Sequence, residues 1–386
     1  MKKFCFSLVA IICFLTACGQ NNRQQLTLKT PVQNISAQQQ QDDKLAKDIG
    51  EMLLVGFRGT TIDRNSHIVR DIKEYHVGSV ILFEYDAPSR KHKRNIENPA
   101  QLKKLCKELQ SLSDTPLLIG VDQEGGMVNR LKPSYGFPTI LSAQAMAEKG
   151  MDTVAHYAQL TATMLRDAGI NLDFAPCADL NVNPQCPIIG KLGRSFSNKS
   201  ETVSQCCTIW LEALTKQHIV GCLKHFPGHG SAQGDTHLGL VDVSNSWTSA
   251  ELEPYKQILS STKVPMIMIA HLLIKQLDED NPTSLSPMVI DQMVRTDLHY
   301  DGVIVTDDLA MGAITKQYGY EQAILKALQA GVDMLCISNN GQSYDSEIVP
   351  KTVKIINEYI EKGMLDPDKI HKSAERIRKM KKEFCK

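Results

Sequence analysis

The sequence predicts a closed (β/α)8 barrel of the TIM type, built as one catalytic domain behind an N-terminal export segment. Eight short apolar runs rich in β-branched residues recur along the chain, and helical patterns separate them. No second composition boundary divides the roughly 340 residues that contain these runs. Strands that alternate with helices indicate a parallel sheet with right-handed crossovers, and eight such units favour a closed barrel. A doubly wound open sheet is the alternative.

The first element, residues 1–17, has two lysines followed by the apolar run FCFSLVAIICFLTA. This arrangement is typical of a secretory signal peptide, and the run is too short for a stable membrane span. It leads into the sequence LTAC (15–18), which resembles the bacterial lipobox, in which the cysteine is acylated and becomes the new N-terminus. We therefore expect an exported lipoprotein, held through Cys18 on the periplasmic or cell-surface side of a membrane. An ordinary secretory signal is the alternative.

The second element, residues 18–42, is rich in Gln and Asn and has almost no large apolar residues. Such a segment cannot bury enough apolar surface to fold, so we expect a flexible tether. A flexible chain of this length has an end-to-end distance of roughly 25–30 Å, enough to hold a domain just off a membrane. The predicted barrel domain then comprises residues 43–386.

The eight predicted strands follow in chain order. They are MLLVGF (52–57), VGSVILF (77–83), PLLIGVD (116–122), INLDFAP (170–176), IVGCLKHF (219–226), PMIMIAH (265–271), DGVIVTDD (301–308) and GVDMLCIS (331–338). Segments with helical spacing lie between them, such as the one that carries Val203, Cys207, Trp210 and Leu214, and helical patterns continue from the last strand to the C-terminus.

Charge and cysteine content exclude some classes of partner. The chain has 43 basic and 43 acidic residues, and loss of two lysines with the signal peptide leaves a net charge of −2, which argues against a nucleic-acid partner. Eight cysteines fall in the folded part, and none has the CxxC spacing of a zinc site. Cys177 and Cys186 are the most local disulfide candidates in an exported protein, and buried free thiols are the alternative. We expect a monomer.

Reactive side chains cluster at the C-terminal ends of the predicted strands, where barrel enzymes carry their active sites. They are Asp122 after the third run, Lys224 and His225 at the fifth, His271 at the sixth, and Asp307 with Asp308 at the seventh. The N-terminal ends of the runs carry few such residues. The barrel prediction and the distribution of chemistry therefore agree.

The loop CLKHFPGHGSAQGDTHLG (222–239) offers enough ligands for a zinc ion. Its candidates are His225, His229, Asp235 and His237. An HxxxH pattern brings two imidazoles together only on a helix, and here a proline and a glycine interrupt it. We therefore expect the rings of His225 and His229 to point apart, His229 to be hydrogen-bonded within the loop, and no metal to be bound.

Several longer motifs occur in a fixed order along the chain: VDQEGG, NPQCPIIGKLGRSF, KHFPGHG followed by DTH, and GVIVTDDLAMGAI. Together with IGEMLLVGFRG, NIENPAQL and ALQAGVDML, they resemble the successive motifs of glycoside hydrolase family 3, specifically its β-N-acetylhexosaminidase branch. The resemblance covers nearly everything after the tether. It implies an exo-acting enzyme, without a cofactor, that removes terminal β-linked N-acetylglucosamine from peptidoglycan fragments (muropeptides) or other glycans.

The resemblance also implies the catalytic residues of a retaining glycosidase, which needs a carboxylate nucleophile and a proton donor. The nucleophile falls on Asp307. Most family members take the donor from a second domain, for which this chain has no room, whereas the hexosaminidase branch uses a loop histidine, here His237, held by Asp235. An imidazole titrates near neutral pH, and Asp235 can orient one ring nitrogen while the other faces the sugar.

Substrate-binding residues follow from the same resemblance. Those implied to line the subsite for the N-acetylglucosamine ring are Asp122, Arg194, Lys224 and His225, with Arg130 and His271 as further candidates. A salt bridge between Asp122 and Arg194 at the rim is the alternative for that pair. The stretch IIGKLGRSF has an extra residue or two before Arg194 compared with the family pattern. Glu124 is expected to make structural hydrogen bonds near the top of the barrel.

Three functions remain open from the sequence. A phosphorylase would use the same site, because a histidine donor would not repel an attacking phosphate dianion as a carboxylate would. A glycan-binding lipoprotein without activity predicts a broken site, yet the candidate nucleophile and donor pair are all present.

Alternation along the seventh strand lets only one of Asp307 and Asp308 point at the pocket, and the resemblance selects Asp307. Participation of the substrate's own acetamido oxygen is the rival mechanism.

Overall fold

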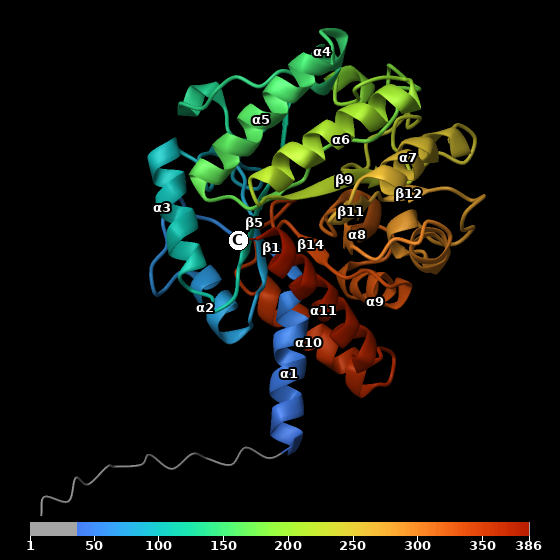
Figure 1. Cartoon of the computed structure of the whole chain (residues 1–386). Coiled ribbons are helices and arrows are strands. Elements are labelled where there is room, and N and C mark those ends of the chain that lie inside the picture. Colours follow the sequence, from blue (N-terminus) through green and yellow to red (C-terminus); the bar gives the residue numbers. More distant parts are fainter. Residues whose placement is uncertain (1–36, 386) are drawn as a thin grey trace, which may run out of the picture.

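The computed structural model describes residues 37–385 and shows a barrel of eight parallel strands surrounded by helices (Figure 1). The strands are β1 (Leu53–Gly56), β2 (Ser79–Ile81), β5 (Leu118–Val121), β8 (Leu172–Asp173), β9 (Val220–Phe226), β11 (Met266–Ile269), β13 (Val303–Thr306) and β14 (Leu335–Ile337). They pair in the order β13-β11-β9-β8-β5-β2-β1-β14, and a parallel bridge between Val305 and Met334 joins the two ends. Each strand lies within one of the eight predicted runs, so the barrel prediction is confirmed.

The helices lie outside the strands and begin and end at recognisable signals. They are α1 (Ala37–Glu51), α2 (His67–Glu74), α3 (Pro99–Gln110), α4 (Ala143–Glu148), α5 (Met151–Ala168), α6 (Ser200–Lys216), α7 (Glu253–Ser261), α8 (Gly312–Thr315), α9 (Tyr320–Ala330), α10 (Ile348–Glu361) and α11 (Pro367–Phe384), with a π-helix, η5 (Met288–Asp297). For example, the Asn98 side chain accepts a hydrogen bond from the Gln101 N–H at the start of α3. No helix within residues 37–385 has the length and hydropathy needed to cross a membrane.

Helix α1 begins at Ala37, before the boundary expected at residue 43. Its Gln-rich first turns are good helix formers that continue the amphipathic pattern of the following residues, which explains why the helix extends into the predicted tether. The side chain of Asp48, which is buried, bonds to His371 and Arg378 of α11. The signal peptide, the lipidation site Cys18 and the tether up to residue 36 lie outside the described residues.

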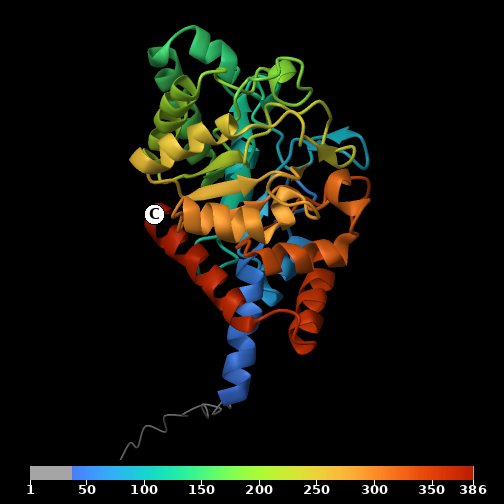
Figure 2. The same cartoon turned by 90° about the vertical axis from the view of Figure 1, so that its right-hand side faces the viewer.

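Helices α1 and α11 lie at the end of the barrel where the strands begin. In Figures 1 and 2, α1 extends away from the barrel beside α11. Buried Lys381 of α11 pairs with Glu51 and donates to the Gly78 carbonyl at 2.8 Å, just before β2. These contacts close the N-terminal end of the barrel and leave the other end for the site.

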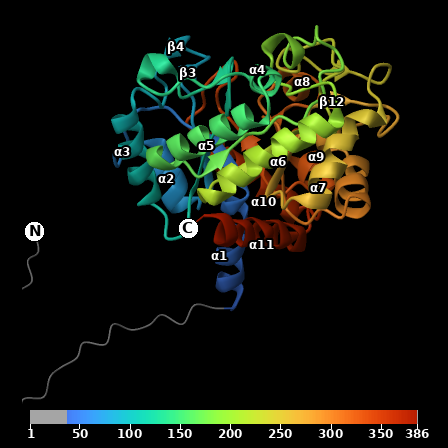
Figure 3. The same ribbon diagram turned by 45° about the horizontal axis from the view of Figure 1, so that its top comes forward.

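Short strand pairs, which the sequence analysis did not predict, follow the C-terminal ends of several barrel strands. They are β3 (Tyr85–Asp86) with β4 (Lys91–His92), β6 (Gln123–Gly125) with β7 (Val128–Asn129), and β10 (Val241–Asp242) with β12 (Leu272–Leu273). Figure 3 shows β3, β4, β12 and α8 on the side of the molecule away from α11. These loops form the walls around the open end of the barrel.

The eight cysteines in residues 37–385 are free thiols, and all but Cys385 are buried. The candidate disulfide between Cys177 and Cys186 is therefore not formed. The Cys177 thiol instead contacts Asp179, and the Cys186 sulfur lies 3.6 Å from the His229 carbonyl oxygen. The alternative, buried free thiols that fill the core as small apolar groups, describes this protein.

Candidate active site

A pocket of about 590 Å³ opens at the C-terminal ends of the strands, within the usual size of small-molecule sites. Most of the predicted site residues line it: Asp122, Arg130, Arg194, Lys224, His225, His237 and Asp307. They come from the ends of three barrel strands, β5, β9 and β13, and from the loops that follow β5, β8 and β9. The fold thus brings together residues that are up to 185 positions apart in the sequence.

Lys224, at the end of β9, is the central cation of the pocket floor. Its Nζ donates to Asp122 Oδ1 at 2.8 Å and to Glu124 Oε1 at 2.7 Å, and Arg130 Nη2 lies 3.4 Å from Asp122 Oδ2. Burial alone would lower the pKa of Lys224, but these two carboxylates raise it above its ordinary value. The ammonium group therefore stays charged and fixes both carboxylates in place.

Arg194 makes a bidentate ion pair with Glu124. Its Nε and Nη2 donate to the two carboxylate oxygens at 2.8 and 2.7 Å, and its Nη1 donates to the Ile188 carbonyl at 2.8 Å. Burial would raise the pKa of Glu124, but the charges of Arg194 and Lys224 hold it far below its ordinary value. Glu124 is therefore an ionised structural group, as expected. Asp122 pairs with Lys224, so the alternative salt bridge between Asp122 and Arg194 is not formed.

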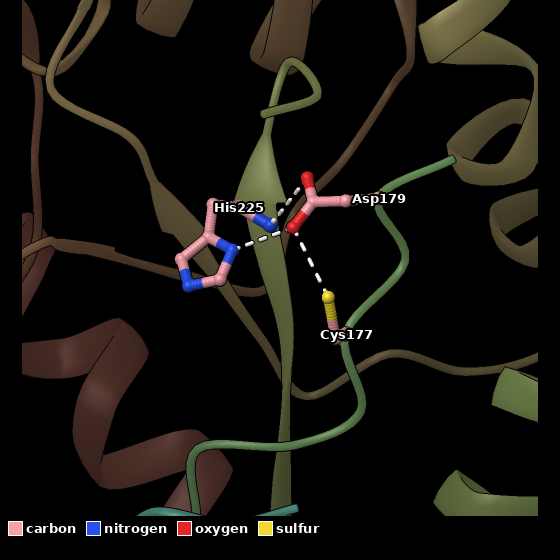
Figure 4. A group of neighbouring side chains, drawn as sticks. All are labelled: Cys177, Asp179 and His225. Atoms are coloured by element: carbon pink, nitrogen blue, oxygen red, sulfur yellow. Dashed lines mark hydrogen bonds and ion pairs between the residues drawn. The ribbon is translucent and has the colours of Figure 1, made fainter. Parts of the chain in front are cut away.

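A hydrogen-bonded group made of Cys177, Asp179 and His225, shown in Figure 4, contacts this pair through His225. Asp179 Oδ2 lies 2.6 Å from His225 Nδ1 and accepts from the Cys177 thiol at 3.1 Å. Arg194 Nη2, which can only donate, lies 3.1 Å from His225 Nε2. His225 therefore accepts through Nε2 and carries its proton on Nδ1, directed at Asp179.

These three side chains form the group of metal-ligating residues that lie close together in the described part of the chain. Two ligands of one tetrahedral zinc ion are roughly 3.3 Å apart, whereas the 2.6 Å between His225 Nδ1 and Asp179 Oδ2 suits a hydrogen bond. A metal on Nδ1 would also place the ring proton on Nε2, against the donor of Arg194. The residues therefore fit a hydrogen-bonded network.

His229 is hydrogen-bonded within the loop, as expected. Its Nε2 lies 3.4 Å from Thr236 Oγ1, and its backbone N–H donates to Asp179 Oδ1 at 2.7 Å. Burial lowers the pKa of the His229 ring to about 4. The expectation that the His225 and His229 rings point apart is wrong: they meet edge to face, with centroids 6.0 Å apart, because the loop turns back immediately after β9.

The predicted contact between His237 and Asp235 is formed. His237 Nδ1 lies 2.7 Å from Asp235 Oδ1, and the same oxygen accepts the His237 backbone N–H at 2.9 Å. The His237 side chain is 63% exposed, and within residues 37–385 its Nε2 makes no hydrogen bond. Asp235 therefore fixes the ring through one nitrogen and leaves the other available to a substrate.

The loop that carries this pair folds over the end of β13. The backbone N–H of Gly312 donates to the His237 carbonyl at 3.2 Å, and Lys316 Nζ donates to the Leu238 carbonyl at 2.7 Å. A Cβ at Gly312 would lie only 2.8 Å from the His237 oxygen, so a glycine is needed for this approach. These contacts hold the loop of the candidate donor against the segment that follows Asp307.

Asp307 and Asp308 have different environments. Both line the pocket, against the expectation from strand alternation that only one of them would. Burial would raise the pKa of Asp307, but His271, His225 and His237 lower it below the ordinary value. Asp308 accepts hydrogen bonds from the Ser338 backbone and hydroxyl and from the Ala310 N–H. Asp307 thus has the ionised carboxylate that a nucleophile needs, whereas Asp308 joins the ends of β13 and β14.

His271 does not line the pocket, so its prediction as a substrate-binding residue is wrong. Its buried ring lies 2.6 Å from Ser284 Oγ through Nδ1 and 3.0 Å from the Asp308 carbonyl through Nε2. Both ring nitrogens are therefore used within the protein. His271 thus holds the backbone of Asp308 by a hydrogen bond and contributes to lowering the pKa of Asp307.

Residues after β2 and β8 contribute to the site and were missed from the sequence. Glu84 lines the pocket and pairs with Lys132 at 2.6 Å, and Tyr85 and His92 line it beside them. Asp179 carries the network described above. Both acids lie just beyond predicted strands, one directly after the run 77–83, and that position was the signal that could have identified them.

Comparisons with known proteins agree with this arrangement. Residues 44–380 match the model of the glycosyl hydrolase family 3 N terminal domain. A Beta-hexosaminidase of Nitrosomonas eutropha is 31% identical over 301 residues, which cover 76% of this chain and 82% of that protein. A Beta-hexosaminidase of Neisseria meningitidis is 33% identical over 278 residues, covering 70% of this chain and 73% of that protein.

Solved structures give the same picture. The glycoside hydrolase family 3 beta-N-acetylglucosaminidase from a Paenibacillus species superposes with a TM-score of 0.79 at 32% identity. The match covers 88% of this chain but 62% of that protein, so this chain spans less than two thirds of its length. A family 3 glycosyl hydrolase of Mycobacterium smegmatis, with a TM-score of 0.73 and 27% identity, is covered over 98% of its length.

Proposed function

The chain belongs to glycosyl hydrolase family 3 and is a glycoside hydrolase, and from this premise we propose that it removes terminal β-linked N-acetylglucosamine with retention of configuration. One observation carries the proposal. The ionised Asp307 and the His237–Asp235 pair lie at the same pocket, and within residues 37–385 the Nε2 atom of His237 has no hydrogen-bond partner. This is the pairing of nucleophile and proton donor that a retaining glycosidase requires.

In the first step, an Asp307 oxygen bonds to the anomeric carbon while His237 Nε2 gives its proton to the departing glycosidic oxygen. Asp235 stabilises the protonated imidazole through Nδ1, at 2.7 Å. In the second step, neutral His237 takes a proton from water, and the water oxygen displaces Asp307 from the sugar. The same side chain is therefore acid and then base.

The pocket floor supplies partners for the sugar hydroxyl and acetamido groups. Asp122 and Arg130 are partly exposed there, and Lys224 and Arg194 line it from beneath. Charged, fixed groups of this kind suit the polar rim of a sugar ring. Their mutual ion pairs keep their positions before substrate arrives, which supports their proposed role in binding.

Exo-action is supported by the wall that lies across the pocket. Around the barrel, β2 is three strands from β9, whose following loop carries His237, so the residues that follow β2 line a different side of the pocket from that loop. Glu84, Tyr85 and His92 lie there, with Lys132 paired to Glu84. Such a wall limits the space beyond one sugar ring, so the enzyme would act at chain ends.

The proposed natural substrates are peptidoglycan fragments or other exported glycans, because the N-terminal segment has the pattern of a lipoprotein signal. We expect acylation at Cys18 and membrane attachment. Incorporation of radiolabelled palmitate and partition into detergent test this, with Cys18→Ser as the control. A mature protein that starts at another residue would contradict it.

Turnover of chromogenic β-glycosides, with and without phosphate, tests the reaction. The 4-nitrophenyl N-acetyl-β-glucosaminide should be cleaved at a rate independent of phosphate, whereas phosphate-dependent release of a sugar phosphate would identify a phosphorylase. Replacement of His237 by Ala should slow cleavage of a natural disaccharide by roughly 10²–10⁴-fold and a 2,4-dinitrophenyl glycoside far less, because that leaving group needs little protonation.

A slow-turnover fluorosugar tests the nucleophile. Peptide mass mapping should locate a glycosyl adduct on Asp307 that is absent from Asp307→Ala. An adduct on Asp308 would contradict the assignment. Strong inhibition by a thiazoline with no adduct anywhere would instead indicate participation of the substrate's acetamido oxygen.

A further inference from the structure

Glu251, in the short 3-10 helix η3 (Ser249–Leu252), is a fully buried carboxylate that the mechanism above does not use. Within residues 37–385 it forms no ion pair with a lysine, arginine or histidine. Its Oε2 accepts the backbone N–H of Gly230 at 2.9 Å and that of Ser231 at 3.3 Å. Burial raises the pKa of Glu251 to about 7.

The carboxylate lies directly against the first turn of the loop that carries the donor pair. A Cβ at Gly228 would come within 2.6 Å of the Glu251 Cβ, and one at Gly230 would come within 1.7 Å of the Leu180 carbonyl oxygen. Glycine is therefore required at both positions for the backbone to approach so closely. The start of the loop is thus clamped between η3 and the segment after β8.

Hydrogen bonds connect this clamped turn with the tip of the loop. His229 lies between the glycine pair, its N–H is fixed by Asp179, and its ring reaches the hydroxyl of Thr236 at 3.4 Å. Thr236 is buried and stands directly between Asp235 and His237. A shift of the first turn is therefore transmitted through the His229 ring to the donor pair.

Stability alone does not explain a carboxylate at this place. A buried carboxylate without a cation costs several kcal/mol relative to water, even when it is hydrogen-bonded. Two N–H donors converge on the same oxygen of Glu251, and this oxygen can accept both bonds whether the carboxyl group is ionised or protonated. The arrangement fixes the position of the loop backbone at an energetic cost to the fold.

We propose that Glu251 is a positioning residue for proton donation: it holds the turn at Gly230 and Ser231 so that His229 and Thr236 place His237 at the leaving oxygen. This inference rests on the proposed function, in which His237 is the donor. Glu251 does not line the pocket. Its effect on the reaction must therefore pass through the loop.

The test compares Glu251→Ala with Glu253→Ala, two residues further along the chain, where the carboxylate is about half exposed and pairs with Lys256. Each variant is measured for kcat/KM with N,N′-diacetylchitobiose, a poor leaving group, and with the 2,4-dinitrophenyl glycoside, a good one. Glu251→Ala, which removes the acceptor of the turn, should lose roughly 10- to 100-fold on the disaccharide, the effect of a donor displaced by about 1 Å, and less than about 3-fold on the aryl glycoside. Glu251→Gln, whose amide oxygen can still accept both N–H groups, should lose less than Glu251→Ala on the disaccharide. Glu253→Ala should match the wild type on both.

A double variant with His237→Ala separates the possible outcomes. Once the donor is absent, Glu251→Ala should cause no further loss on the disaccharide. Equal losses on both substrates in the single variant, or an additive loss in the double variant, would overturn the inference and leave Glu251 a structural residue. Glu251→Asp, whose carboxylate is one methylene further from the turn, is measured in parallel and should show the same contrast, so that one variant that fails to fold does not prevent the test.

Failure of the proposed function looks different. If His237→Ala itself loses equally on both substrates, then the donor assignment fails and the positioning role fails with it. If His237→Ala shows the contrast but none of the Glu251 variants does, then only the inference about Glu251 is wrong.

Discussion

Replacement of Glu124 by Gln tests the electrostatic account of the pocket floor. In the native protein this carboxylate neutralises two buried cations: Arg194 at 2.7 and 2.8 Å and Lys224 at 2.7 Å. The amide keeps the shape of the side chain but removes its charge and turns one acceptor into a donor, which then faces the N–H groups of a cation. Lys224 then retains Asp122 as a neighbouring counter-charge, and Arg194 retains the charge of Asp179.

The expected loss of stability follows from breaking a buried pair by removal of one partner, about 3–5 kcal/mol. The unfolding entropy of globular proteins is about 2.1 cal/mol/K per residue, which gives roughly 0.7 kcal/mol/K for this domain. Glu124→Gln should therefore lower the unfolding midpoint by roughly 4–7 °C. Both substrates should be cleaved more slowly to a similar degree, because the cations that bind the sugar are displaced.

Thermal unfolding followed by circular dichroism measures this shift, and Glu347→Gln is the matched control. Glu347 also makes a close pair with an arginine, Arg70, at 2.8 and 3.0 Å, but its side chain is 47% exposed. Removal of an exposed pair should cost less than about 1 kcal/mol. If Glu124→Gln shifted the midpoint no more than Glu347→Gln and slowed only the disaccharide, Glu124 would be an acid catalyst and the reasoning would be refuted.

Three further predictions follow from the same geometry. Asp308→Asn should still form the glycosyl adduct with a fluorosugar, whereas Asp307→Ala should form none and should lose more than about 10³-fold in kcat. Loss of the adduct in both variants would show that the two carboxylates act together. Gly230→Ala should lower activity and the unfolding midpoint because its Cβ would meet a carbonyl oxygen at 1.7 Å, while Gly239→Ala, where a Cβ meets nothing within 4 Å, should resemble wild type. The pKa of His229 is about 4 in the folded protein and about 6.5 in the unfolded chain, so between these pH values the unfolded state binds one more proton. The free energy of unfolding, measured with urea, should therefore fall by up to roughly 3 kcal/mol from pH 6.5 to 4. His229→Asn should flatten this pH dependence, and an unchanged dependence in that variant would contradict the prediction.

The barrel was predictable because each of its strands is buried on both faces. Parallel strands covered by helices are short continuous apolar runs, and this pattern is visible in the sequence at all eight places. The strand pairs above the barrel, such as Tyr85–Asp86 with Lys91–His92, are two residues long and show no periodicity. Their pairing depends on the barrel that positions them, so nothing in the local sequence indicates it.

The candidate site was predictable to the level of which residues lie at strand ends, but not which residues they contact. His271 follows its strand in the same way as Asp122, yet Ser284 and the Asp308 carbonyl occupy both of its ring nitrogens. Arg194 similarly finds Glu124, 70 positions away, instead of Asp122. Such choices depend on distances of a few tenths of an ångström between loops, which are set only when the barrel closes.

A histidine donor suits the electrostatics of this pocket better than a carboxylic acid. The pocket and its floor already contain several carboxylates, among them Asp122, Glu124 and Asp307. Another acid beside them would raise the pKa of Asp307, since like charges disfavour one another's ionised forms. His237 instead contributes to lowering the pKa of Asp307. In the proposed mechanism, His237 thus helps to keep Asp307 ionised while it holds a proton for the leaving group.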